Sequence, residues 1–115
     1  MTENSLAVLD VGQLRDISLD DRELMREIVS ALIDDTRQQI PLLDLAIRDE
    51  DSQRCARLAH YSKGACANVG AQSAAALLKA LERQAGDCQF QQCSESLAAL
   101  ARELERLQVE AQMLA

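Results

Sequence analysis

The stretch that decides the fold runs SQRCARLAHYSKGACANVG from residue 52 to residue 70. Ser52 and the acidic residues just before it are suited to cap the N-terminus of a helix. Asn68, Val69 and Gly70 are typical of that helix's end, because glycine readily takes the left-handed conformation that closes many helices. A further helix is expected over residues 72–85. The short turn between them, near Ala71, predicts an antiparallel pair.

Apolar residues spaced three or four apart predict helices on both sides of this pair. A short helix is expected over residues 11–17, and a long one begins near Asp20 or Asp21. The long helix passes through Pro41, where we expect a kink rather than an end. Its apolar stripe is Leu24, Ile28, Leu32, Thr36, Ile40, Leu43 and Ile47. After a break at residues 85–88, the last helix has the stripe Phe90, Cys93, Leu97, Leu100, Leu104 and Leu107.

Four amphipathic helices with short connections predict an all-α fold, an antiparallel four-helix bundle with a short additional N-terminal helix laid across it. The composition agrees, since 48% of the residues are hydrophobic but only 2% are aromatic, and glycine and proline are scarce. The 115 residues are expected to form one domain, 1–115, with a flexible N-terminus over residues 1–7.

The sequence has neither an apolar run of about 18 residues nor a basic-then-apolar leader, so we expect a cytoplasmic protein without membrane insertion. The four cysteines, at positions 55, 66, 88 and 93, form no CxxC pair. In a reducing compartment they are expected to be small buried side chains rather than disulfides.

The net charge of −7 argues against nucleic-acid binding, which favours a basic surface. The charge is also unevenly distributed. Between Ser52 and Leu81 there is no acidic residue, whereas the segment has four basic ones: Arg54, Arg57, Lys63 and Lys79. Chance clustering on a solvated face is one explanation, but the only histidine lies in this segment. We therefore favour docking of an acidic partner there.

A helical wheel at about 100° per residue places His60 on the outward face of its helix. Gln53, Ala56, Gly64 and Ala67 surround it, with Arg57 and Lys63 at the edges. The opposite, inward side holds Leu58, Ser62, Ala65 and Val69, flanked by Cys55 and Cys66. Because these cysteines point away from the only histidine, no metal site is expected.

Glycine inside a helix costs about 1 kcal/mol relative to alanine, so Gly64 needs a reason. Either it lets another protein's backbone approach His60, or it packs against a neighbouring helix; the outward direction favours the first. A solvent-facing imidazole is a nucleophile near neutral pH, and Lys63 can neutralise an anion delivered to it. We therefore expect a phosphoryl acceptor. No glycine-rich phosphate loop is present, so the phosphoryl group would come from another protein.

These residues resemble the signature of histidine-containing phosphotransfer (HPt) domains. The matching positions are Ala59, His60, Lys63, Gly64, Gly70, Ala71, Leu81 and Glu82. The resemblance implies a monomeric phosphoryl carrier, without kinase activity or cofactor of its own, acting between receiver domains of hybrid sensor kinases and response regulators. His60 would be phosphorylated at Nε2, and Lys63 would be its charge partner. The receiver would supply the aspartate and Mg²⁺.

Two positions depart from the pattern, since Ser62 and Ala74 stand where leucine is common. We expect the Ser62 hydroxyl to donate to the Leu58 carbonyl. The resemblance extends to chemotaxis-kinase domains, in which the residue matching Glu82 hydrogen-bonds the histidine. His60 and Glu82 are equally far from Ala71 in sequence, so they should lie at the same height. The alternative is a surface carboxylate that pairs with Lys79 or Arg83.

Two other functions remain open at this point. The chain could be a docking module of the same fold that binds a kinase or receiver without being phosphorylated. It could also be a structural bundle that self-associates through its acidic faces.

Overall fold

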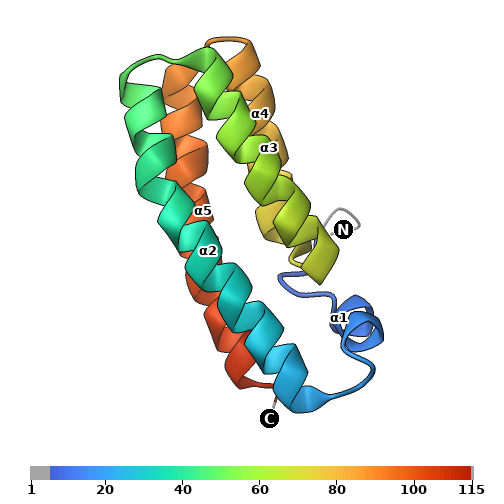
Figure 1. The fold of residues 1–115 in the computed structure, drawn as a ribbon. Coiled ribbons are helices and arrows are strands. Elements are labelled where there is room, and N and C mark those ends of the chain that lie inside the picture. The colour runs from blue at the N-terminus through green and yellow to red at the C-terminus, as the bar shows by residue number, and fades with distance from the viewer. Residues whose placement is uncertain (1–5, 115) are drawn as a thin grey trace, which may run out of the picture.

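The computed structural model describes residues 6–114, which form five helices and no strand. They are α1 (Val11–Ile17), α2 (Arg22–Arg48), α3 (Ser52–Val69), α4 (Gln72–Gly86) and α5 (Phe90–Gln112). Helices α2–α5 form the bundle, and α1 lies across its lower end, beneath the turn from α3 to α4 (Figure 1). Both α3 and α5 pack against α2 and α4. The predicted all-α bundle with a short N-terminal helix is confirmed.

Helix α2 begins at the N-cap Asp21, whose carboxylate accepts from the Leu24 amide, and it continues through Pro41 to Arg48. Its apolar stripe was predicted wrongly at the N-terminal end. Leu24 is 38% exposed, whereas Met25 and Val29 are buried. The buried residues Val29 and Met25 lie three and seven positions before Leu32, whereas the predicted stripe used the positions four and eight before it. Both spacings fit a helix, and packing decides between them.

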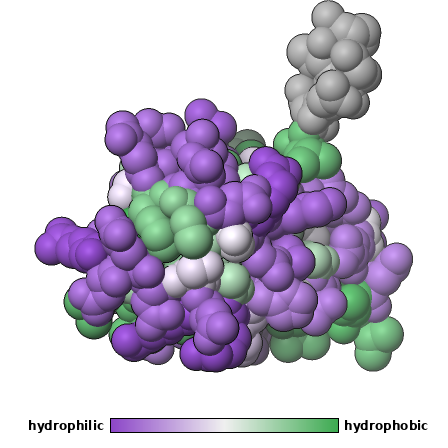
Figure 2. Space-filling model, turned by 90° about the horizontal axis from the view of Figure 1, so that it is seen from above, coloured by the Kyte–Doolittle hydropathy of each residue, from purple (hydrophilic) through white to green (hydrophobic). Residues whose placement is uncertain are grey.

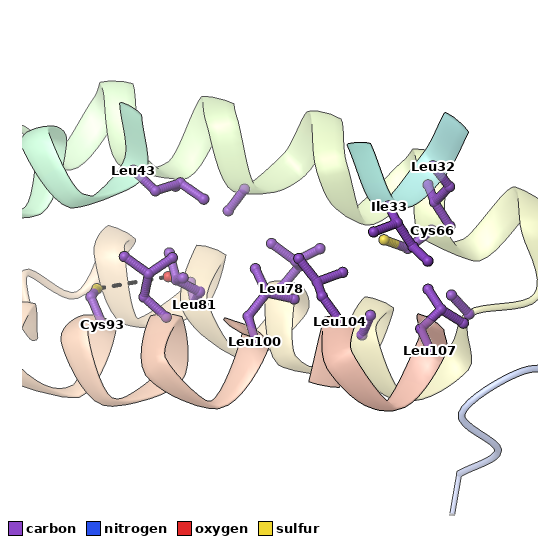
Figure 3. Close-up of a cluster of buried hydrophobic side chains, with 14 of the residues drawn as sticks. Leu32, Ile33, Leu43, Cys66, Leu78, Leu81, Cys93, Leu100, Leu104 and Leu107 are labelled. Atoms are coloured by element: carbon purple, nitrogen blue, oxygen red, sulfur yellow. Dashed lines mark hydrogen bonds between the residues drawn. The ribbon is translucent and has the colours of Figure 1, made fainter. Parts of the chain in front are cut away.

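The core is aliphatic, as the composition predicts. Leucines from α2, α4 and α5 meet between the helices, where Figure 3 shows Leu43, Leu78, Leu81, Leu100 and Leu104. Ala74, the second departure from the family pattern, is also buried.

Three of the four cysteines lie in the core as free thiols, whereas the prediction was wrong for Cys88, which is exposed in the turn between α4 and α5. Burial raises the pKa of the Cys55 thiol to about 12 and that of Cys66 to about 11. These two thiols are therefore protonated and poor nucleophiles at neutral pH.

The segment before α1 is hydrogen-bonded to the turn between α3 and α4. Gly70 closes α3 with φ 96°, the predicted left-handed cap. Its carbonyl accepts from the Asp10 amide at 2.8 Å, and the Ala7 carbonyl accepts from the Ser73 amide at 3.0 Å. Of the predicted flexible segment 1–7, residues 1–5 lie outside the described part, while Ala7 is hydrogen-bonded in this way. The turn below the site is thus held in place by the N-terminal segment.

The inward face of α3 is centred differently from the prediction. Its buried residues are Cys55, Ala59, Ser62 and Cys66, while Leu58, Ala65 and Val69 are partly buried at the edges. The expected hydrogen bond from Ser62 to Leu58 is wrong, since the buried Ser62 hydroxyl has no hydrogen-bond partner within residues 6–114.

Ser62→Ala is expected to stabilise the protein by about 1 kcal/mol, because it removes an unsatisfied buried hydroxyl and improves helix propensity. Urea denaturation of the two proteins measures the difference. A loss of stability would show that the hydroxyl forms a hydrogen bond in solution.

The surface at the end of the bundle where α2 meets α3 is mostly hydrophilic, with small separate apolar areas (Figure 2). Among residues 6–114, no helix combines the length and the hydropathy needed to cross a membrane.

Candidate functional site

His60 lies in the middle of α3 with its side chain 68% exposed. The outward direction predicted by the helical wheel is therefore what the structure shows. Its Nδ1 is 3.1 Å from Oε2 of Glu82, which α4 presents at the same height. The antiparallel α3–α4 pair thus brings together two residues that are far apart in the sequence.

Glu82 also contacts Lys63, whose Nζ donates to Oε1 at 2.7 Å. Each carboxylate oxygen therefore has its own partner, one on the imidazole and one on the ammonium group. Of the two alternatives for Glu82, the structure shows the contact with His60. The cation that pairs with it is Lys63 rather than Lys79 or Arg83.

The Lys63 hydrogen bond, followed by that of His60, holds the pKa of Glu82 below its usual value, although partial burial acts in the opposite direction. Glu82 is therefore ionised at neutral pH. A carboxylate only accepts, so the proton of the neutral imidazole lies on Nδ1. The Nε2 atom then has the free lone pair and is the nucleophilic nitrogen.

The lowered pKa of Glu82 predicts a pH-dependent contribution to stability. A carboxylate with a depressed folded-state pKa stabilises the fold above its unfolded pKa, and that stabilisation is lost as the pH falls through the folded value. Glu82→Gln is therefore expected to cost up to about 1 kcal/mol at pH 7 and progressively less as the pH falls towards 3. Urea denaturation at the two pH values measures this. An equal cost at both would assign the effect to packing.

Small residues surround the imidazole, as predicted. A Cβ atom at Gly64 would have no neighbour within 4 Å. The alternative in which Gly64 packs against a neighbouring helix is therefore wrong. Ala67 is exposed and Ala56 partly buried, while Gln53 and Arg57 are exposed on the same helix.

A shallow hollow of about 520 Å³ lies beside this area, between α3 and α4. Its α3 side consists of Lys63, Gly64 and Ala67. Its α4 side includes Ala75, Ala76 and Lys79, of which only Lys79 was singled out from the sequence. The acid-free segment, which extends to Leu81, was the available signal, because it continues past the turn into α4.

The residues between His60 and α2 were not predicted from the sequence either. Tyr61, the next residue along α3, is 56% exposed, and its hydroxyl donates to Oδ2 of Asp35 on α2 at 3.3 Å. No periodicity marks this pair, because it depends on the register of α2 against α3.

Within residues 6–114, no group of three or more His, Cys, Asp or Glu side chains is arranged to hold a metal ion. Beside the imidazole of His60, Glu82 contacts Nδ1 of the ring and forms an ion pair with Lys63.

Comparison with known proteins gives a family and a structural relative. The model of the Hpt domain family matches residues 27–110. Among solved structures, the chain is similar to histidine-containing phosphotransfer protein B (HptB) from Pseudomonas aeruginosa PAO1, with a TM-score of 0.83, 22% identity and 95% of each chain covered. No curated protein matches. The family match includes α3, α4 and the residues around His60.

Proposed function

Since the chain belongs to the Hpt domain family, whose members are phosphocarrier proteins, we propose that it carries a phosphoryl group on His60 between receiver domains. The group would arrive from the receiver domain of a hybrid sensor kinase and leave to that of a response regulator. The observation that supports this most directly is the exposed imidazole with Glu82 on its Nδ1.

In the proposed transfer, the Nε2 lone pair of His60 attacks the phosphorus of an aspartyl phosphate on the partner. A P–N bond forms, the P–O bond breaks, and the aspartate leaves as a carboxylate. The ring keeps its Nδ1 proton and becomes cationic, so Glu82 offsets the new charge. Lys63 lies beside the arriving phosphoryl group and compensates its negative charge. Transfer of this kind depends mainly on positioning and charge.

The partner would provide the rest of the reaction centre, namely the aspartate and its Mg²⁺. We expect the carrier to act as a cytoplasmic monomer, without a cofactor of its own. The segment without acidic residues, from Ser52 to Leu81, favours approach of a carboxylate-rich receiver surface.

Incubation with a receiver domain phosphorylated on aspartate tests the proposal. We expect acid-labile, alkali-stable label on the parent chain and none on His60→Gln. Val109→Ala, which changes an exposed residue of α5, controls for handling and should label like the parent. Binding of receivers without any label would favour the docking module, and self-association that is indifferent to His60→Gln would favour the structural bundle.

A further inference from the structure

The two sides of His60 differ in chemistry. Towards α4 lie the charged residues Lys63 and Glu82. Towards α2 lies Tyr61, the chain's only tyrosine, with its hydroxyl on Asp35. An aromatic ring on the surface therefore borders the imidazole on one side only.

The Tyr61 ring is well suited to contact a partner. It is 56% exposed, yet its hydroxyl is hydrogen-bonded to a neighbouring helix, which restricts its rotamers before any partner binds. Little side-chain entropy is then lost on association. Tyrosine is also among the residues that most often dominate binding energy at interfaces, because it combines a large apolar area with a polar tip.

The surroundings leave the ring accessible. At about 100° per residue, Gly64 and Arg57 lie between His60 and Tyr61 around the circumference of α3. Gly64 has open space above its Cα, so no side chain there shields the ring. A partner that reaches His60 therefore meets Tyr61 in the same approach.

We propose that Tyr61, held by Asp35, is the anchor residue that selects among receiver domains on the α2 side of the site. This inference rests on the proposed function. The receiver it fits presents an apolar surface to the ring, with a basic side chain beside it to pair with the Asp35 carboxylate. Lys63 and Glu82 serve the transfer, whereas Tyr61 and Asp35 determine which receiver stays bound long enough for it.

The single tyrosine allows a direct test. A chain labelled with 3-fluorotyrosine gives one fluorine resonance, which should shift or broaden as an unphosphorylated receiver domain is added. In parallel, Tyr61→Ala should weaken receiver binding by about tenfold to thirtyfold. Tyr61→Phe should retain most of the affinity, and Asp35→Asn should lose part of it. Val109→Ala, at 55% exposure on α5, is the matched control and should bind like the parent. Circular dichroism checks that each variant is folded.

An unperturbed fluorine signal at saturating receiver, or Tyr61→Ala binding as tightly as the parent, overturns this inference. If either result occurs while His60→Gln still loses the label, the proposed function stands and only the role of Tyr61 is overturned. If no receiver labels the parent chain but one binds it, the proposed function fails, and the same titration still decides the role of Tyr61. If no receiver binds or labels the chain, both are overturned.

Discussion

Replacing Gly64 by leucine is expected to leave the protein at least as stable as the parent while slowing phosphoryl transfer to His60 by about two orders of magnitude. Stability should hold because a Cβ at this position would meet nothing within 4 Å. Leucine is also a better helix former than glycine, by up to about 1 kcal/mol. Transfer should fail because the new side chain stands one turn from His60 on the face that a receiver must contact.

Thermal denaturation and the rate of label transfer measure the two effects separately. Ala101→Leu is the matched control, because it adds a leucine at an exposed position of α5, a helix packed on α2 and α4 rather than on the outward face of α3. That variant should transfer normally. Substantial unfolding of Gly64→Leu would contradict the open position of Gly64, and normal transfer would contradict approach of the partner over it.

Gly70→Ala is expected to lower the free energy of unfolding by about 2–4 kcal/mol, the largest stability effect predicted for this chain. The residue has φ 96°, where a side chain is strained, and a Cβ would lie 2.9 Å from the Asp10 backbone oxygen. Relief of that clash would disturb the hydrogen bond from the Asp10 amide to the Gly70 carbonyl. The cost therefore combines local strain with loosening of the N-terminal segment.

Urea denaturation measures this cost, and Gly86→Ala provides the control. Gly86 lies at the end of α4 with open space around its Cα, so alanine there should be neutral or slightly stabilising. Equal effects of the two substitutions would show that the left-handed turn and its contact with Asp10 contribute little.

The helices could be predicted from the sequence because their signals are local. Asp21 and Asp51 cap the starts of α2 and α3 with their carboxylates, and Gly70 ends α3 in the left-handed conformation. Helix α1 was predicted over the range that it occupies. Which residues face the core depends instead on contacts with the other helices. Met25 and Leu24 are adjacent and both apolar, so only packing against the other helices distinguishes them.

The absence of hydrogen-bond partners among the described residues at two buried polar groups, Glu103 and Ser62, could not be predicted. Glu103, in α5, is 4% exposed; its Oε1 is 3.6 Å from Arg106, and its Oε2 has no hydrogen-bond partner within residues 6–114. A glutamate is normally expected at the surface, since an unpaired buried carboxylate is costly. Ser62 likewise has no internal partner. Such exceptions follow from the arrangement of neighbouring helices rather than from the residue itself.

The candidate site was largely predictable because most of it lies within one turn of His60 on α3. Glu82 could be placed at the right height by counting from the turn, but its two contacts depend on side-chain directions. Tyr61 and Asp35 are separated by a helix connection, so their pairing required the three-dimensional structure.

A single exposed imidazole limits what the proposed carrier can store. With one histidine in the chain, each molecule holds at most one phosphoryl group, and donor and recipient must visit the same face in turn. The two partners therefore compete, and a bound recipient delays reloading. In the proposed relay, the abundance of the carrier would then set an upper limit on the number of phosphoryl groups in transit.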